Sequence, residues 1–127
     1  MLVADDDPVS QQVVQHLLQT LGLEVEVVDD GAQAVARIEQ DDWDLVFLDC
    51  EMPVLDGCDA ARAIRALAPR LPLVALTASE LQADARACRE AGMEEVLTKP
   101  IHLDHLREVV TRLLTRDRLP PKEAPSR

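Results

Sequence analysis

The 127 residues are enough for one domain, and 47% of them are hydrophobic, so the chain can bury a core. Its formal net charge of -11 argues against binding to nucleic acid and to anionic membrane surfaces. No apolar run approaches the about 20 residues of a membrane span. The three cysteines lack metal-ligand spacing, so we expect reduced thiols in a cytoplasmic protein.

The first half of the chain alternates short apolar runs with stretches of helical period. Residues 1–4 predict a short strand, and Pro8 begins a helix that Asp7 caps. An alternating edge strand is expected at 23–28, and a second helix from Gly31. The predicted apolar stripe of the first helix comprises Val13, Val14, Leu17, Leu18 and Leu21.

The middle of the chain contains the most hydrophobic predicted strands. Residues 45–48, Leu-Val-Phe-Leu, have no polar face, which predicts a central parallel strand, and residues 73–76 predict another. Gly57 begins a helix between them, and Ser79 is expected to cap the next helix. The predicted apolar stripe of the helix from Gly57 comprises Ala60, Ala61, Ile64 and Leu67.

The last elements are a short strand at 95–97 and a helix at 102–116. Residues 119–127 are Pro-rich and polar, which is typical of a linker or a ragged end. We therefore place a single domain at 1–117 and a linker or disordered tail at 118–127. We also expect the chain to be part of a multidomain protein, whose full length could include a membrane anchor.

Five strands and five helices in strict alternation predict an α/β fold. Such an alternation favours a parallel sheet with helices on both faces. In sheets of this kind, ligands bind outside the carboxyl ends of the strands. The residues that follow each strand are therefore the candidates for function.

Polar side chains follow four of the predicted strands: Asp5, Asp6 and Asp7 the first, Asp49 the third, Thr77 the fourth and Lys99 the fifth. Clustered carboxylates need a cation, and oxygen-only ligands favour Mg²⁺, with Mn²⁺ as an alternative. Asp49 is then placed as a nucleophile that forms an aspartyl-phosphate, while the hydroxyl and the amine hold phosphoryl oxygens. Each residue alone has an ordinary structural explanation, such as a helix cap or a loop acid, but the set together predicts phosphoryl-transfer chemistry.

The stretches LVADDDPVS, LDCEMPVLDG, LTA and TKPI resemble the receiver domain of two-component response regulators, over residues 1–116. LDCEMPVLDG is most similar to the receivers of hybrid sensor histidine kinases. The resemblance implies a flavodoxin-like, doubly wound fold with strand order 2-1-3-4-5. It also implies a phosphorelay partner, either a histidine kinase or a histidine phosphotransfer protein.

The resemblance assigns the acidic residues to the phosphoacceptor and its metal. It implies that Asp49 is the phosphoacceptor, that Asp5 and Asp6 bind Mg²⁺, and that the backbone carbonyl of Glu51 is a further ligand. The domain itself would accept and lose a phosphoryl group rather than turn over a substrate, although a longer parent chain could be a histidine kinase.

The resemblance also implies a switch. Thr77 matches the switch hydroxyl, Lys99 the lysine that pairs with the acceptor and then the phosphate, and the Lys99–Pro100 bond is expected to be cis. Many receivers carry an aromatic residue at the position of Val96, but this chain contains no tyrosine. A partner face, which could also serve a homodimer, is expected on the fourth helix, the last strand and the fifth helix.

Two alternatives stay open at this point. One is a receiver-like interaction module that is never phosphorylated, and the other is a hydrolase with an aspartyl-phosphate intermediate. Degenerate modules usually lack part of the acid, hydroxyl and lysine set, and such hydrolases usually carry Asp where this chain has Glu51. His16, His102 and His105 are expected to be solvated helix residues rather than phosphorylation sites.

Overall fold

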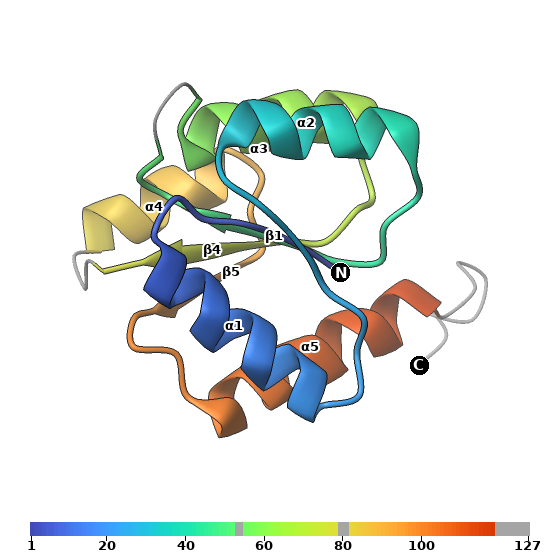
Figure 1. The fold of residues 1–127 in the computed structure, drawn as a ribbon. Helices are drawn as coiled ribbons and strands as arrows, with labels where there is room; N and C mark the ends of the chain where they lie inside the picture. The colour runs from blue at the N-terminus through green and yellow to red at the C-terminus, as the bar shows by residue number, and fades with distance from the viewer. Residues whose placement is uncertain (53–54, 79–81, 119–127) are drawn as a thin grey trace.

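The computed structural model describes residues 1–52, 55–78 and 82–118. For residues 82–84 and 115–118 it describes the backbone alone. Five strands and five helices alternate in these ranges, as predicted (Figure 1). The predicted cap Ser79 and the tail 119–127 lie outside the described residues. The elements are β1 Leu2–Ala4, α1 Pro8–Thr20, β2 Glu26–Val28, α2 Gly31–Gln40, β3 Val46–Asp49, α3 Gly57–Leu67, β4 Leu73–Thr77, α4 Gln82–Glu90, β5 Glu95–Thr98 and α5 Leu103–Arg118.

All strands of the described sheet are parallel, and their order is β2-β1-β3-β4-β5. This confirms the predicted flavodoxin-like, doubly wound topology. The strands are in close register: Ala4 lies opposite Leu48, which lies opposite Ala75 on the other side. The carboxyl ends of four strands therefore meet at one edge of the sheet.

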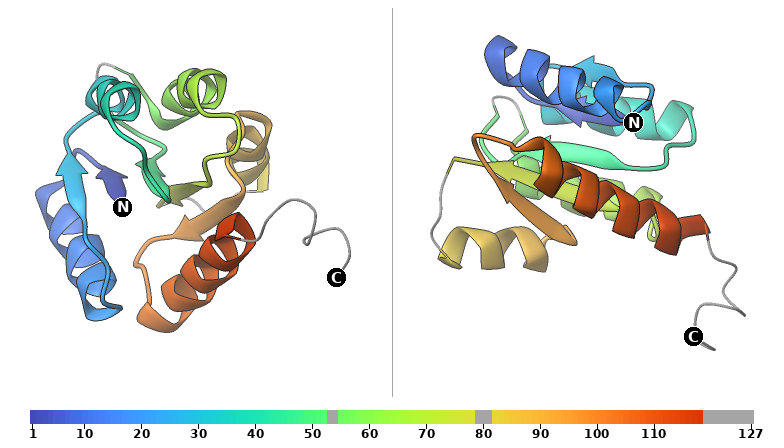
Figure 2. Two further views of the ribbon diagram at one scale, coloured as in Figure 1. Left: turned by 90° about the vertical axis from the view of Figure 1, so that its right-hand side faces the viewer. Right: turned by 90° about the horizontal axis from the view of Figure 1, so that it is seen from below.

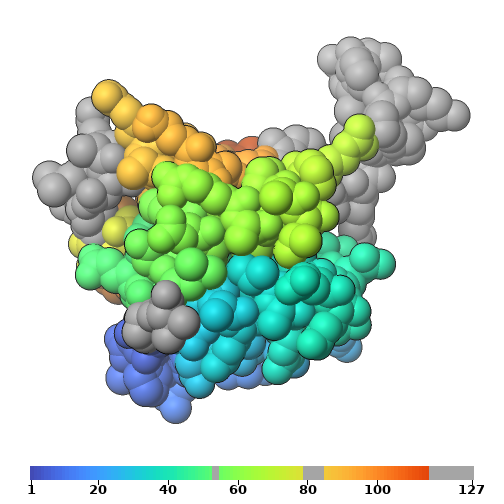
Figure 3. Space-filling model, turned by 90° about the horizontal axis from the view of Figure 1, so that it is seen from above, coloured from blue at the N-terminus to red at the C-terminus, as the bar shows by residue number. Residues whose placement is uncertain are grey.

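Helices cover both faces of the sheet (Figure 2), and a separate hydrophobic core lies on each side of it. Helices α2, α3 and α4 contribute to one core, and α1 and α5 cover the opposite face. Figure 3 shows α2 and α3 side by side over the first face. Along β3, Val46 and Leu48 enter the first core while Phe47 enters the second, and all three are fully buried. Burial on both faces explains why this strand has no polar side.

Some predicted details were wrong. The edge strand begins at Glu26 rather than at Leu23, because the amide of Leu23 still closes the end of α1 by bonding the carbonyl of Leu18. Val13 and Leu67 belong to the predicted apolar stripes of their helices but are 42% and 49% exposed. Both lie on the edge of their helix stripe, where a helical period alone cannot decide between core and solvent.

Candidate functional site

Three side chains meet where β1, β3 and β5 end. Lys99, directly after β5, donates hydrogen bonds to Oδ2 of Asp5 at 3.1 Å and to Oδ2 of Asp49 at 3.2 Å. Asp5 is fully buried and Asp49 is 6% exposed. One ammonium group therefore bridges two buried carboxylates that are 44 residues apart in the sequence, and the predicted juxtaposition is present.

The carboxylates form a cluster that suits a cation. Oxygens of Asp5, Asp6 and Asp49 all lie within 4.8 Å of one another. Two of the three residues are buried, and Asp6 is exposed, so the cluster opens to solvent on one side. Three carboxylates with a single lysine leave excess negative charge, and an all-oxygen donor set suits a hard divalent ion. The residues present therefore fit Mg²⁺.

Burial changes the acid–base behaviour of this cluster. Removal from water, reinforced by the neighbouring Asp5, raises the pKa of Asp49 from 3.8 to about 6, although the Glu51 amide and Lys99 oppose the rise. Burial disfavours the charged form of Lys99, but its hydrogen bonds and charge interactions with Asp5 and Asp49 prevail and raise its pKa. At neutral pH both groups are charged, so Asp49 is available as a carboxylate nucleophile.

The backbone around Asp49 holds the carboxylate in place. The amide of Cys50 donates to the carbonyl of Leu76 at 2.9 Å, and the amide of Glu51 donates to Oδ1 of Asp49 at 3.0 Å. At Gly57, a Cβ atom would collide with the backbone of Asp49 and Cys50. Glycine at this position therefore lets the start of α3 approach the end of β3.

The remaining predicted site residues lie at the same edge. Thr77, 4% exposed, is the last residue of β4, and its carbonyl accepts a hydrogen bond from the amide of Lys99 at 2.7 Å. The side chain of Glu51 is exposed, so its contribution to Asp49 comes from the backbone. The Lys99–Pro100 bond is cis, as predicted.

Sequence reasoning missed Gln11. Its side-chain amide donates to the carbonyl of Asp5 and, at 2.8 Å, to Oδ1 of Asp29, and so links the acidic turn after β1 to the end of β2. Gln11 lies on the same side of α1 as the buried Val14 and Leu18. A polar residue that continues a buried stripe was the signal that could have identified it.

Residues 1–111 match the family described as the response regulator receiver domain. The chain belongs to this family. It is 41% identical over 115 residues to the sensor protein GacS of Pseudomonas syringae pv. syringae. The matched region covers 87% of this chain and 13% of GacS. It is 37% identical over 118 residues to the hybrid signal transduction histidine kinase L of Dictyostelium discoideum, covering 87% of this chain and 7% of the kinase.

A solved receiver domain supports the same assignment. The receiver of the sensor histidine kinase PA1611 of Pseudomonas aeruginosa PAO1 superimposes with a TM-score of 0.85 at 41% identity, covering 90% of this chain and 95% of that chain. That structure has a magnesium ion coordinated in its active site cleft. The present chain is thus a receiver domain of two-component systems, homologous to receivers of hybrid kinases, and it spans a small fraction of the length of its curated relatives.

Across the described residues, none of the helices combines the length and apolar character that crossing a bilayer requires.

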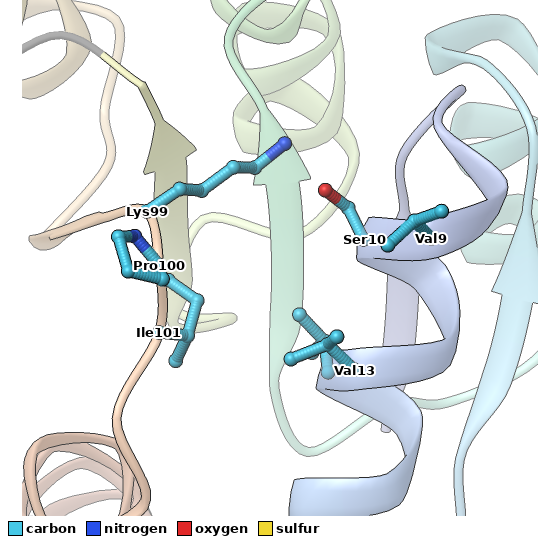
Figure 4. Close-up of a pocket in the computed structure, with 7 residues that line it drawn as sticks. Val9, Ser10, Val13, Lys99, Pro100 and Ile101 are labelled. Carbon is cyan, nitrogen blue, oxygen red and sulfur yellow. The ribbon is translucent and has the colours of Figure 1, made fainter.

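An apolar pocket lies on the α1 side of the receiver site (Figure 4). Its volume is about 320 Å³, and its lining includes Val9, Val13 and Ile101 together with Lys99. The side chains of Lys99 and Ser10 point toward each other at its upper end in Figure 4. Val9 is 68% exposed and Val13 is 42% exposed, so apolar surface faces solvent beside the ammonium group that binds Asp49.

A second, smaller pocket lies on the α4 side. It has a volume of about 180 Å³ and is lined by Cys50, Glu51, Cys58, Thr77, Ala87 and Cys88. All three cysteines are free thiols; Cys88 is buried, and Cys50 and Cys58 are half-buried. Burial, reinforced by Cys88, raises the pKa of Cys58 to about 11. The same causes raise the pKa of Cys50 by more than that of Cys58.

Proposed function

We propose that this receiver accepts a phosphoryl group on Asp49 from a phosphohistidine donor, in a reaction that requires Mg²⁺. The observation that carries the proposal is the contact of Lys99 with both Asp5 and Asp49 inside a cluster of three carboxylates. A buried carboxylate held by an ammonium group and a metal-binding pair has the placement that a phosphoacceptor needs.

In this reaction an oxygen of Asp49 attacks phosphorus, an O–P bond forms, and the N–P bond to the donor histidine breaks. The leaving imidazole takes the electron pair of that bond. Asp5, Asp6, Asp49 and the carbonyl of Glu51 would hold Mg²⁺, which supplies positive charge to the phosphoryl oxygens when bound. Lys99 moves its hydrogen bond from the Asp49 carboxylate to a phosphoryl oxygen.

Thr77 is the proposed switch residue. Its hydroxyl would donate to another phosphoryl oxygen, and it is the last residue of β4, from which the chain runs on toward α4. A shift of Thr77 toward the phosphoryl group would therefore be transmitted along this connection. We infer that phosphorylation selects a different arrangement of this side of the domain and thereby changes partner binding. The homodimer through α4, β5 and α5 stays a prediction.

We further propose that the donor docks on the apolar pocket beside α1. A protein that delivers a phosphoryl group to Asp49 must cover the surface around Lys99, and Val9 and Val13 are the exposed apolar residues there. Burial of this surface would give a histidine kinase or histidine phosphotransfer protein binding energy that a small phosphodonor lacks. A cytoplasmic location follows from this partnership and agrees with the free thiols.

The test is intact mass after incubation with acetyl phosphate. We expect the mass of one added phosphoryl group with Mg²⁺, and none without Mg²⁺ or in Asp49→Asn. Uptake by Asp49→Asn equal to wild type would contradict the acceptor assignment. If neither acetyl phosphate nor a phosphorylated histidine kinase modifies the folded, Mg²⁺-binding protein, the interaction module without phosphorylation becomes the better interpretation. Sustained hydrolysis of a phosphate ester would instead favour the hydrolase.

A further inference from the structure

Three of the chain's sulfur atoms gather on the α4 side of the acceptor, although their residues come from distant parts of the sequence. Cys50 directly follows Asp49, Cys58 is the second residue of α3, and Cys88 lies in α4. The proposed phosphoryl chemistry uses none of these thiols. Their grouping in a sheet–helix junction beside the acceptor therefore needs its own explanation.

One pair in this group is already in contact. Sγ of Cys50 lies 3.0 Å from Sγ of Cys88, across 38 residues of sequence. A disulfide has an S–S length of about 2.05 Å. The two sulfurs therefore need to approach by only about 1 Å to be joined. A shift of that size needs only a small movement of α4 and of the backbone at Cys50.

The pair is also reachable from outside. Cys50 is half-buried and lines the pocket of about 180 Å³ on the α4 side, whereas Cys88 is 2% exposed. A small oxidant can therefore meet Cys50 first, while Cys88 lies directly behind it. This order suits a first thiol that is oxidised and a second thiol that resolves the product. Burial raises the pKa of Cys50, so its thiolate is scarce at neutral pH and we expect the oxidation to be slow.

We propose that Cys50 and Cys88 form a reversible disulfide when this receiver is exposed to peroxide. The Cys50 thiol loses its proton, its sulfur attacks one peroxide oxygen and the O–O bond breaks. The released hydroxide takes up a proton, so a sulfenic acid and a first water form. The Cys88 sulfur then attacks the sulfenic sulfur, the S–O bond breaks, and a second water leaves. Two thiols are oxidised by two electrons in total, and one peroxide is reduced to two waters. A dithiol reductant reverses the reaction by thiol–disulfide exchange.

The disulfide would also act on the proposed phosphoryl transfer. It would tie α4 to the residue that follows Asp49, at a pocket that Thr77 also lines. Closing the sulfur pair by about 1 Å moves the backbone beside a nucleophile whose placement must hold within about 0.5 Å. Misplacement of this size slows a reaction strongly, so we expect the oxidised domain to take up phosphoryl groups at least about tenfold more slowly. This second part rests on the proposed function.

The test uses the folded protein and hydrogen peroxide. We expect a loss of two hydrogen atoms in the intact mass, a peptide that joins Cys50 to Cys88, and return to the starting mass with dithiothreitol. Cys58→Ser should form the same disulfide, whereas Cys50→Ser and Cys88→Ala should not form it. Absence of the disulfide in the folded protein, formation only in denaturant, or a bridge that contains Cys58 would overturn the proposal.

Phosphoryl uptake from acetyl phosphate provides a separate readout. Oxidised wild type should be at least about tenfold slower than reduced wild type, and oxidation should not change the rate of Cys50→Ser. Equal rates for the oxidised and reduced forms would overturn the regulatory part. If neither form takes up phosphate, the proposed function has failed, and the mass and peptide results still decide whether the disulfide exists.

Discussion

Asp49 has two very different flanks. On the α1 side, which we call the apolar flank, Val9, Val13 and Ile101 line a pocket beside Lys99. On the α4 side, the thiol flank, Cys50 and Cys88 are in contact beside Thr77. Val9 and Val13 of the apolar flank are exposed, while the thiol flank contains the buried Cys88.

The difference indicates how one carboxylate can serve two tasks. An exposed apolar surface can be covered by another protein without any rearrangement of the core. A half-buried junction between a strand end and a helix responds instead to small changes in internal geometry, because packed interiors transmit displacement. We infer that the apolar flank serves delivery of the phosphoryl group and that the thiol flank serves the response of the domain.

The largest effect is expected for the residue that contacts both carboxylates. Lys99→Ala removes the ammonium group from Asp5 and Asp49. We expect the initial rate of phosphoryl uptake from acetyl phosphate to fall about 100-fold, because charge stabilisation of a transferring group by one donor is typically of this size. Arg62→Ala, which removes an exposed ion pair with Asp59 on α3, is the matched control and should not change the rate. A reduction of less than about threefold for Lys99→Ala would contradict its role.

A smaller effect should separate the apolar flank from the acceptor chemistry. With Val9→Asn and Val13→Asn combined, which adds no charge beside Lys99, transfer from a phosphorylated histidine phosphotransfer domain should slow about tenfold, since loss of an apolar contact typically costs about 1–3 kcal/mol. Uptake from acetyl phosphate should stay unchanged. Both side chains are exposed, so folding should tolerate the change.

The control for this variant is Leu67→Asn. Leu67 is a similarly exposed apolar residue at the end of α3, away from the lining of either pocket beside Asp49. The control should leave both reactions unchanged. Equal slowing with the protein donor and with acetyl phosphate would mean that the apolar flank acts on the acceptor itself, and the comparison between the flanks would fail.

The smallest effect concerns stability without metal. Because the pKa of Asp49 rises from 3.8 to about 6 on folding, the folded state binds the proton more tightly than the unfolded state. The charged carboxylate of Asp49 therefore lowers the stability of the folded domain. This loss of stability is complete above about pH 6 and is absent well below pH 3.8. A shift of about two units is worth at most about 3 kcal/mol. This shift already includes the attraction of Lys99. Asparagine reproduces only some hydrogen bonds of the carboxyl group, which offsets part of the gain, so we expect Asp49→Asn to raise the free energy of unfolding by about 1 kcal/mol at neutral pH.

Urea unfolding at two pH values measures this difference. The gain of Asp49→Asn should be larger at about pH 7.5 than at about pH 4.5, where Asp49 is protonated in the folded state but still partly ionised in the unfolded state. Mg²⁺ should stabilise the wild type and leave the variant nearly unchanged, because binding to the folded state alone raises stability. A variant less stable than wild type at about pH 7.5 would contradict the direction of the pKa shift.

Much of the site could be predicted from the sequence, because in a parallel sheet the strand ends alone bring residues together. The run at 45–48 has no polar face, so it had to be central, and the polar residues after the strands had to share one edge. Strand order came from the family resemblance rather than from the pattern. The sequence predicted that Lys99, Asp5 and Asp49 lie at the same sheet edge. The distances from the Lys99 ammonium to the two carboxylates come only from the packing.

Other features were decided only by the tertiary structure. Val13 and Leu67 belong to predicted apolar stripes but are exposed, because the neighbouring elements determine where the core ends. Gly57 fits a simple helix start in the sequence, yet its backbone contact with Asp49 excludes a side chain. The contact of Cys50 with Cys88 joins residues 38 apart, and no local pattern encodes it. The sequence alone determined which chemical groups the strands deliver, while side-chain packing across the sheet edge decided which of them touch.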